Sequence, residues 1–166
     1  MKANTHLLHL ANETETDQLA QRLAPLLRHG GRIYLIGDLG AGKTHFVRAL
    51  LRSCGVTGRI KSPSFTLVEP YKVSNLYFYH FDFYRFNDPR EWIDAGFRDA
   101  FKEDAVVLVE WPDKAAGQLP APDLTLELIY DGDGRQAKLT ASTARGQVWL
   151  NTLFPPMTPT NSPAQP

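Results

Sequence analysis

Glycines, a lysine and a threonine near residue 40 stand at a spacing that suits a bound phosphate. The stretch Gly37-Asp38-Leu39-Gly40-Ala41-Gly42-Lys43-Thr44 matches the pattern G-x-x-x-x-G-K-[ST] in full. Glycines allow backbone N–H groups to turn inward around an anion. The lysine ammonium can then pair with phosphate oxygens, and the threonine hydroxyl can bind Mg²⁺. A glycine-rich turn with a surface lysine would have the same letters, so the flanking elements must decide.

The segments on either side of the loop are those that a phosphate-binding loop requires. Residues 32–37, RIYLIG, are predicted to form a buried strand, and residues 43–54 an amphipathic helix. The inner face of that helix would carry Phe46, Val47, Leu50 and Leu51. Its N-terminus has a partial positive charge that favours a bound anion. We therefore predict a nucleotide site in which Lys43 reaches the β- and γ-phosphates and Thr44 binds Mg²⁺.

Two acidic residues end predicted strands and could complete this site. Glu110 closes the apolar run AVVLVE, which predicts a central parallel strand, and it would hold Mg²⁺ directly or through water. The alternative to this Mg²⁺ role is that Glu110 is an acid at a strand end that faces solvent. Asp82 lies in an aromatic strand segment, where an acid needs a partner. That partner is either Mg²⁺-bound water or, in an ion pair, Arg85 or Arg59.

The polar residues inside and after the loop are each compatible with two roles. Asp38 would repel a phosphate if it pointed inward, so we expect it to point outward, bonded to the loop or exposed to solvent. The segment KSPSFT, residues 61–66, carries three hydroxyls that could sense a γ-phosphate. An ordinary Ser-Pro turn is the alternative there.

The remaining pattern predicts a mixture of strands and helices. A strand is expected at 5–11 and a helix at 12–31, with a capping box at Thr14 and Asp17 and a kink at Pro25. Paired strands are expected at 64–71 and 75–86, followed by a helical or turn-rich segment at 88–101. A further strand is expected at 105–111. Paired strands at 123–130 and 135–142 would flank the turn DGDG, and a helix or strand would follow at 146–154. Alternation along 75–86 gathers Tyr77, Tyr79, Phe81 and Phe83 on one face, either core or a partner surface, with core favoured.

Composition places the chain among ordinary globular proteins. Of 166 residues, 43% are hydrophobic and 22% charged, which suits one buried core. Zero net charge neither supports nor excludes a local basic patch. The single cysteine, Cys54, excludes an intrachain disulfide and is expected to be a small buried residue at a helix end. Without an apolar run of membrane-spanning length or a leader sequence, we expect a cytoplasmic protein with no membrane attachment.

Four ordered motifs, the loop with KSPSFTLVEPY, YHFDFYR and LVEW, closely resemble one family, the bacterial TsaE (YjeE) ATPases of tRNA threonylcarbamoyladenosine synthesis. The resemblance implies an α/β fold of the P-loop NTPase type, a three-layer sandwich with a mixed, mainly parallel central sheet. We expect one domain over residues 1–154. Residues 155–166 contain five prolines and almost no apolar side chains, which predicts a disordered tail.

The resemblance also implies an activity and partners. A protein of this family would be a weak Mg²⁺-dependent ATPase that acts with TsaD and TsaB. That complex transfers a threonylcarbamoyl group to N6 of an adenosine beside the anticodon of tRNAs reading codons that begin with A. The ATPase would support turnover rather than catalyse the transfer, and it would meet tRNA only through the complex.

Carried onto this sequence, the resemblance assigns catalysis to Lys43, Asp82 and Glu110. It assigns Mg²⁺ binding to Thr44, Glu110 and Asp82. Contacts with ATP would come from the loop, Gly37–His45, from Asn12 and Glu13 near the adenine, and from Arg135. The main departure is His45, which replaces a second threonine that could reach the α-phosphate.

Two other functions are compatible with the same residues. A small-molecule kinase would need an arginine lid, for which Arg85, Arg90 and Arg98 are the available cluster, but no acceptor-binding signature is visible. A nucleotide-sensing adaptor would bind ATP without needing Asp82 or Glu110 for its role.

Overall fold

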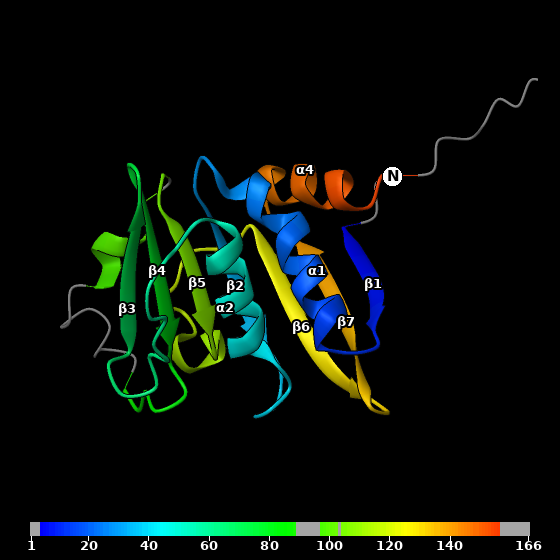
Figure 1. Ribbon diagram of the computed structural model, residues 1–166. Coiled ribbons are helices and arrows are strands. Elements are labelled where there is room, and N and C mark those ends of the chain that lie inside the picture. The colour runs from blue at the N-terminus through cyan, green and yellow to red at the C-terminus, as the bar shows by residue number, and fades with distance from the viewer. Residues whose placement is uncertain (1–3, 89–96, 103, 157–166) are drawn as a thin grey trace, which may run out of the picture.

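The computed structural model describes residues 4–88, 97–102 and 104–156, and within them it forms one seven-stranded sheet with helices against it (Figure 1). The strands are β1 (Thr5–Leu10), β2 (Gly31–Ile36), β3 (Val68–Val73), β4 (Leu76–Asp82), β5 (Val106–Glu110), β6 (Leu124–Asp131) and β7 (Gly134–Ala141). The α-helices of the described chain are α1 (Glu13–Leu23), α2 (Lys43–Ser53) and α4 (Ala144–Leu153). Its short 3₁₀ helices are η1 (Ala24–Leu27), η2 (Phe97–Ala100) and η3 (Pro112–Ala115).

The sheet brings the ends of its central strands to one edge. Its order is β1-β7-β6-β2-β5-β4-β3. Strands β6, β2, β5 and β4 run parallel, whereas β3 and β7 run the opposite way and β1 pairs antiparallel with β7. The loops that follow β2, β5, β4 and β6 therefore gather at one edge, where ligands bind in open α/β sheets. The predicted α/β fold with a mixed, mainly parallel sheet is confirmed.

Helices α1 and α2 lie against one face of the sheet, and α4 packs beside α1 (Figure 1). The apolar stripe of α2 is fully buried, as predicted, at Phe46, Val47, Leu50 and Leu51. Trp149 of α4 fills the space over Gly31, where a Cβ atom would lie 2.1 Å from the indole. This face holds the larger of the apolar cores in the described chain.

The opposite face carries a second core that is rich in aromatic rings. Phe81 and Phe83 are fully buried there, and the Phe81 ring meets Phe97 of η2 at 5.3 Å between centroids. Together with η3, this layer makes the architecture the predicted three-layer sandwich. The predicted aromatic face of β4 is thus divided, because Tyr77 is 47% exposed.

The helix expected over 12–31 is shorter, and Pro25 explains why. Helix α1 ends at Leu23, and Pro25 lies in the first turn of η1 instead of kinking a continuous helix. Proline has no N–H to continue the α-helical ladder, so the chain tightens into a 3₁₀ turn before reaching β2.

The cap of α1 also differs from the prediction. The capping box proposed for Thr14 and Asp17 is wrong, because Asn12 is the N-cap and its side chain accepts the Glu15 N–H at 3.0 Å. The Glu15 carboxylate accepts the Ala11 N–H at 2.7 Å in return. This is a reciprocal cap of the same physical kind, set two residues earlier.

Strand β3 begins four residues later than the predicted 64–71 strand. Residues 63–67 form a turn in which the Leu67 N–H donates to the Pro63 carbonyl at 2.9 Å, and Leu67 has a φ of 68°. The β3–β4 hairpin itself is confirmed, with Val73 opposite Leu76. Strand β4 ends at Asp82, short of the predicted 86.

The remaining predicted elements are placed as follows. Strand β5 is central and parallel, as predicted, and β6 and β7 pair around the DGDG turn. The segment at 146–154 is helical, within α4. Most of 88–101 and of the predicted tail lies outside the described residues. No helix in the described chain is long and apolar enough to cross a membrane.

The divided face of β4 makes a stability prediction. Phe81→Ala should lower the free energy of unfolding by about 3–5 kcal/mol, because it leaves a cavity in a closed aromatic core. Tyr77→Ala, a matched change on the same strand and face, should cost less than about 1 kcal/mol because its ring is half exposed. Urea unfolding measures both values, and equal losses would contradict the assignment of Phe81 to the core.

Candidate functional site

The loop between β2 and α2 has the backbone that its glycines permit. Gly42, the N-cap of α2, has a φ of 111°, and Gly40 has a φ of 81°. A side chain at Gly40 would also place Cβ 2.9 Å from the Tyr130 hydroxyl. The Ala41 N–H closes a turn onto the Asp38 carbonyl at 3.0 Å. The loop therefore ends at the N-terminus of α2, where backbone N–H groups favour an anion.

A cavity of about 570 Å³ opens over this loop and is large enough for a nucleotide-sized ligand. Its lining residues are Glu13, Asp38, Leu39, Gly40, Gly42, Lys43, Thr44, His45, Ser64, Asp82, Tyr84, Arg85, Glu110 and Trp111. Most of the predicted site residues are thus brought together, including both strand-end acids. A larger cavity, lined by Pro25, Cys54 and Phe78 among others, involves none of them.

Lys43 is buried in the loop rather than extended into solvent. Its ammonium donates to the carbonyls of Gly37 and, at 3.3 Å, Asp38. It also lies 4.0 Å from the ring centroid of Trp111, a cation–π contact. Burial lowers the pKa of Lys43, and nearby carboxylates, first that of Glu110, oppose this shift. The lysine side chain is therefore held inside the cavity.

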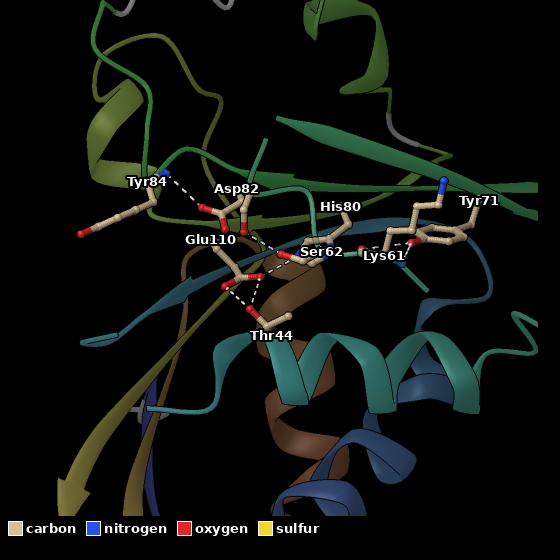
Figure 2. Close-up of polar contacts among 9 residues, drawn as sticks. Thr44, Lys61, Ser62, Tyr71, His80, Asp82, Tyr84 and Glu110 are labelled. Carbon is tan, nitrogen blue, oxygen red and sulfur yellow. Dashed lines mark hydrogen bonds and ion pairs between the residues drawn. The ribbon is translucent and has the colours of Figure 1, made fainter. Parts of the chain in front are cut away.

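Glu110 lies directly against the residue predicted to bind Mg²⁺. The Thr44 hydroxyl is 2.9 Å from Oε1 and 3.1 Å from Oε2 of Glu110 (Figure 2). The carboxylate is 2% exposed, which excludes the alternative of a solvent-facing acid at a strand end. Carboxylate and hydroxyl oxygens are the hard ligands that Mg²⁺ prefers, and Mg²⁺ usually keeps several waters. The donor set therefore fits this ion.

His80 is the residue that the sequence did not single out. Its Nε2 lies 2.6 Å from Oε2 of Glu110 (Figure 2), and its ring is buried, with Nδ1 lacking a hydrogen-bond partner in the described chain. A carboxylate oxygen accepts hydrogen bonds, so Nε2 of His80 donates to Glu110 and fixes its orientation. Its position on the same strand face as Asp82 was the available signal.

Asp82 lies beside Glu110 across the β4–β5 pairing. Its carboxylate accepts the Tyr84 N–H at 2.9 Å, and neither Arg85 nor Arg59, both within the described chain, forms an ion pair with it. Burial raises the pKa of Asp82, the Tyr84 N–H opposes this shift, and Glu110 adds to it. Asp82 is thus a buried acid that lines the cavity, and neither of the two arginines predicted for it is its partner.

The residues expected near the adenine line a smaller cavity, of about 170 Å³, which shares Gly40, Gly42 and His45 with the larger one. Glu13 lines both cavities, whereas the Asn12 side chain is used to cap α1. The Nε2 atom of His45 lies 2.7 Å from Oδ1 of Asp17, so this imidazole faces α1 rather than the loop interior. Arg135 lines this cavity and donates to loop carbonyls.

Residues around the mouth of the cavity are less enclosed. Ser64 lines it and lies 2.7 Å from the Ser62 hydroxyl. The Arg85 guanidinium stacks on the Phe65 ring at 4.6 Å. Arg90, which would complete a kinase-type arginine lid, lies outside the described residues.

Within the described chain, no group of three or more His, Cys, Asp or Glu side chains is arranged to hold a metal ion. A Mg²⁺ ion at this site would depend on Thr44 and Glu110, with its other ligands from phosphate and water.

Two further residues named from the sequence lie in or near the loop. Asp38 lines the cavity. Cys54 caps α2, and burial raises the pKa of its thiol to about 11, which agrees with an unreactive role.

Fold and site together define an α/β protein of the P-loop type. A crystal structure of YdiB from Bacillus subtilis matches with a TM-score of 0.77 and 30% identity, covering 92% of this chain and 96% of that one. The sequence profile described as "Threonylcarbamoyl adenosine biosynthesis protein TsaE" matches residues 10–138. This chain belongs to the TsaE family.

Individual relatives agree with that assignment. The tRNA threonylcarbamoyladenosine biosynthesis protein TsaE of Haemophilus influenzae is 44% identical over 115 residues, which cover 69% of this chain and 73% of that protein. The protein of the same name from Bacillus subtilis is 37% identical over 143 residues, covering 86% of this chain and 89% of the relative.

The buried acid in the cavity makes a pH-dependent stability prediction. The raised pKa of folded Asp82 means that the unfolded chain ionises first as the pH rises past the ordinary value of 3.8, so folding stability is lost above it. Asp82→Asn cannot ionise and can still accept the Tyr84 N–H. It should therefore melt at a higher temperature than the wild type at pH 7, with the gain shrinking towards pH 3.

Thermal unfolding between pH 3 and pH 8 measures this gain. Asp133→Asn is the control, because Asp133 is exposed and its change should give no comparable gain. A gain for Asp82→Asn that was the same at every pH would contradict the assigned cause.

Proposed function

We propose that this protein is a Mg²⁺-dependent ATPase that supports threonylcarbamoyladenosine modification of tRNAs reading codons that begin with A. The names of its TsaE relatives support the pathway. The observation that carries the ATPase assignment is the contact between Thr44 and Glu110 directly after the phosphate loop. That contact unites two of the three predicted Mg²⁺ ligands, although 66 residues separate them in sequence.

Each residue then has a role in ATP binding or hydrolysis. The loop N–H groups and Lys43 bind and orient the β- and γ-phosphates. Thr44 and Glu110 hold Mg²⁺, which when bound neutralises charge on the phosphate oxygens. Asp82 faces the same cavity and orients the attacking water through a hydrogen bond. Trp111, stacked on Lys43, limits the positions that the ammonium can take.

The protein acts with TsaD and TsaB homologues, and its ATP cycle resets that pair rather than transferring the threonylcarbamoyl group. This division of labour agrees with a cavity whose named groups all serve phosphate, metal or water. Contact with tRNA comes through the complex. The work takes place in the cytoplasm, where ATP, Mg²⁺ and tRNA are present together.

The loop assignment is tested by Lys43→Ala. This change should weaken ATP binding about 30-fold or more, because an unpaired phosphate charge costs about 2–5 kcal/mol. Calorimetry measures the affinity, and circular dichroism should show the fold intact. The exposed Lys72 provides a matched control, since Lys72→Ala should bind ATP normally. Unchanged ATP affinity in Lys43→Ala would refute the assignment.

The partner dependence is tested by ATP hydrolysis with and without the two homologues. We expect slow hydrolysis by the isolated chain and a changed rate when TsaD and TsaB are added together, because the ATPase cycle is coupled to that pair. Glu110→Gln should abolish the change while preserving the fold. Phosphoryl transfer to a metabolite faster than to water would favour a small-molecule kinase. Intact complex function in Glu110→Ala and Asp82→Ala would favour a nucleotide-sensing adaptor.

A further inference from the structure

Three successive carbonyls of the phosphate loop are hydrogen-bonded to side chains of the β6–β7 hairpin. The Tyr130 hydroxyl donates to the Leu39 carbonyl at 2.9 Å. Arg135 donates from Nε to the Ala41 carbonyl at 2.9 Å and from Nη2 to the Gly40 carbonyl at 3.3 Å. Two side chains thus hold the outer side of the loop at every peptide unit between residues 39 and 42.

Tyr130 and Arg135 act as one unit. They are direct cross-strand partners in the β6–β7 pairing, and the Arg135 guanidinium lies 4.3 Å from the Tyr130 ring centroid. The remaining Arg135 nitrogen, Nη1, donates to the Gly134 carbonyl at 2.8 Å. All three guanidinium nitrogens are therefore used by backbone carbonyls, which fixes the side chain against the loop.

The geometry of the peptide bond turns these contacts into a constraint on the anion site. In a trans peptide the C=O and the following N–H point in opposite directions, and the described chain has no cis bond. Holding the Leu39 and Ala41 carbonyls toward the hairpin aims the N–H groups of Gly40 and Gly42 away from it. Both glycines line the 570 Å³ cavity as well as the smaller one beside Arg135, and N–H groups aimed away from the hairpin point toward the larger cavity, where the loop meets Lys43 and Thr44. The third N–H, that of Ala41, closes the turn onto Asp38.

We propose that Tyr130 and Arg135 form a clamp that orients the loop N–H groups for a phosphate before any ligand binds. They are positioning residues: they act on the ligand through the loop backbone and touch no part of the nucleotide. The assignment differs from the sequence expectation that Arg135 contacts the nucleotide itself. It depends on the proposed function, because it presumes that the loop binds a nucleotide phosphate.

Ligand binding separates the clamp from a direct contact. In calorimetry, Tyr130→Phe should weaken the binding of ADP and the binding of inorganic pyrophosphate by the same factor. The expected factor is about 3- to 10-fold, because only one hydrogen bond to the loop is removed. Arg135→Gln should do the same with a larger loss. If Arg135 contacted adenine or ribose directly, Arg135→Gln would weaken the binding of ADP and leave the binding of pyrophosphate unchanged. That result would overturn the clamp.

A conservative variant separates geometry from charge. Arg135→Lys keeps the positive charge but loses the planar fork that reaches two carbonyls. The clamp predicts that Arg135→Lys binds pyrophosphate as poorly as Arg135→Gln. Recovery of wild-type affinity in Arg135→Lys would overturn it in favour of a long-range charge effect. Arg28→Gln and Tyr77→Phe, which change exposed residues outside both cavities at the loop, are the matched controls and should bind normally.

Amide hydrogen exchange tests the clamp without any ligand. In the nucleotide-free protein, Tyr130→Phe and Arg135→Gln should speed exchange at Ala41, whose N–H donates to the Asp38 carbonyl within the clamped loop, while leaving α2 and β5 unchanged. Unchanged exchange at Ala41 would overturn the clamp. If the wild type bound neither ADP nor pyrophosphate, the proposed function would fail, and the exchange experiment would still decide whether the hairpin orders the loop.

Discussion

The contact between Thr44 and Glu110 is the constraint on which the rest of the site depends. It exists because β2 and β5 are parallel neighbours, with Leu35 opposite Glu110, so that both strands deliver their following residues to the same edge. A slip of one residue in β5 would turn Glu110 to the aromatic face of the sheet. The parallel pairing of β5 with β2 on one side and β4 on the other opposes that slip, because both registers would have to shift together. Packing of the sheet therefore sets the geometry of the candidate metal ligands.

The same edge concentrates charge that folding alone would disfavour. Lys43, Asp82 and Glu110 are all buried there, and burial shifts the pKa of Lys43 downward and that of Asp82 upward, in each case against the charged form. Buried charges are retained at a cost when a function needs them. The surrounding groups reduce that cost locally, since Trp111 faces the ammonium and Thr44 binds the Glu110 carboxylate. An ion pair kept for stability alone would not need two buried acids and a buried lysine around an open cavity.

Periodic patterns predicted the elements that carry this site, and contacts between distant side chains were harder to predict. The stripe that includes Phe46, the loop glycines and the apolar run before Glu110 each follow from local rules, so α2, the loop and β5 were anticipated. The start of β3 was missed because Pro63 begins a turn within a β-like sequence. The role of Arg135 depends on a hairpin folding back onto a loop 94 residues away in sequence, which no local pattern encodes.

The phosphate loop is held by side chains on both of its sides. Inside the cavity, Lys43 donates to the Gly37 and Asp38 carbonyls, while outside it Tyr130 and Arg135 hold the next three. A loop ordered in advance loses less conformational entropy when a ligand binds, so more of each N–H contact appears as affinity. His80 does the same for Glu110, a candidate metal ligand, through its contact with the carboxylate. The loop carbonyls and the Glu110 carboxylate are thus each fixed by neighbouring side chains, so the geometry of the candidate site is set by the fold itself.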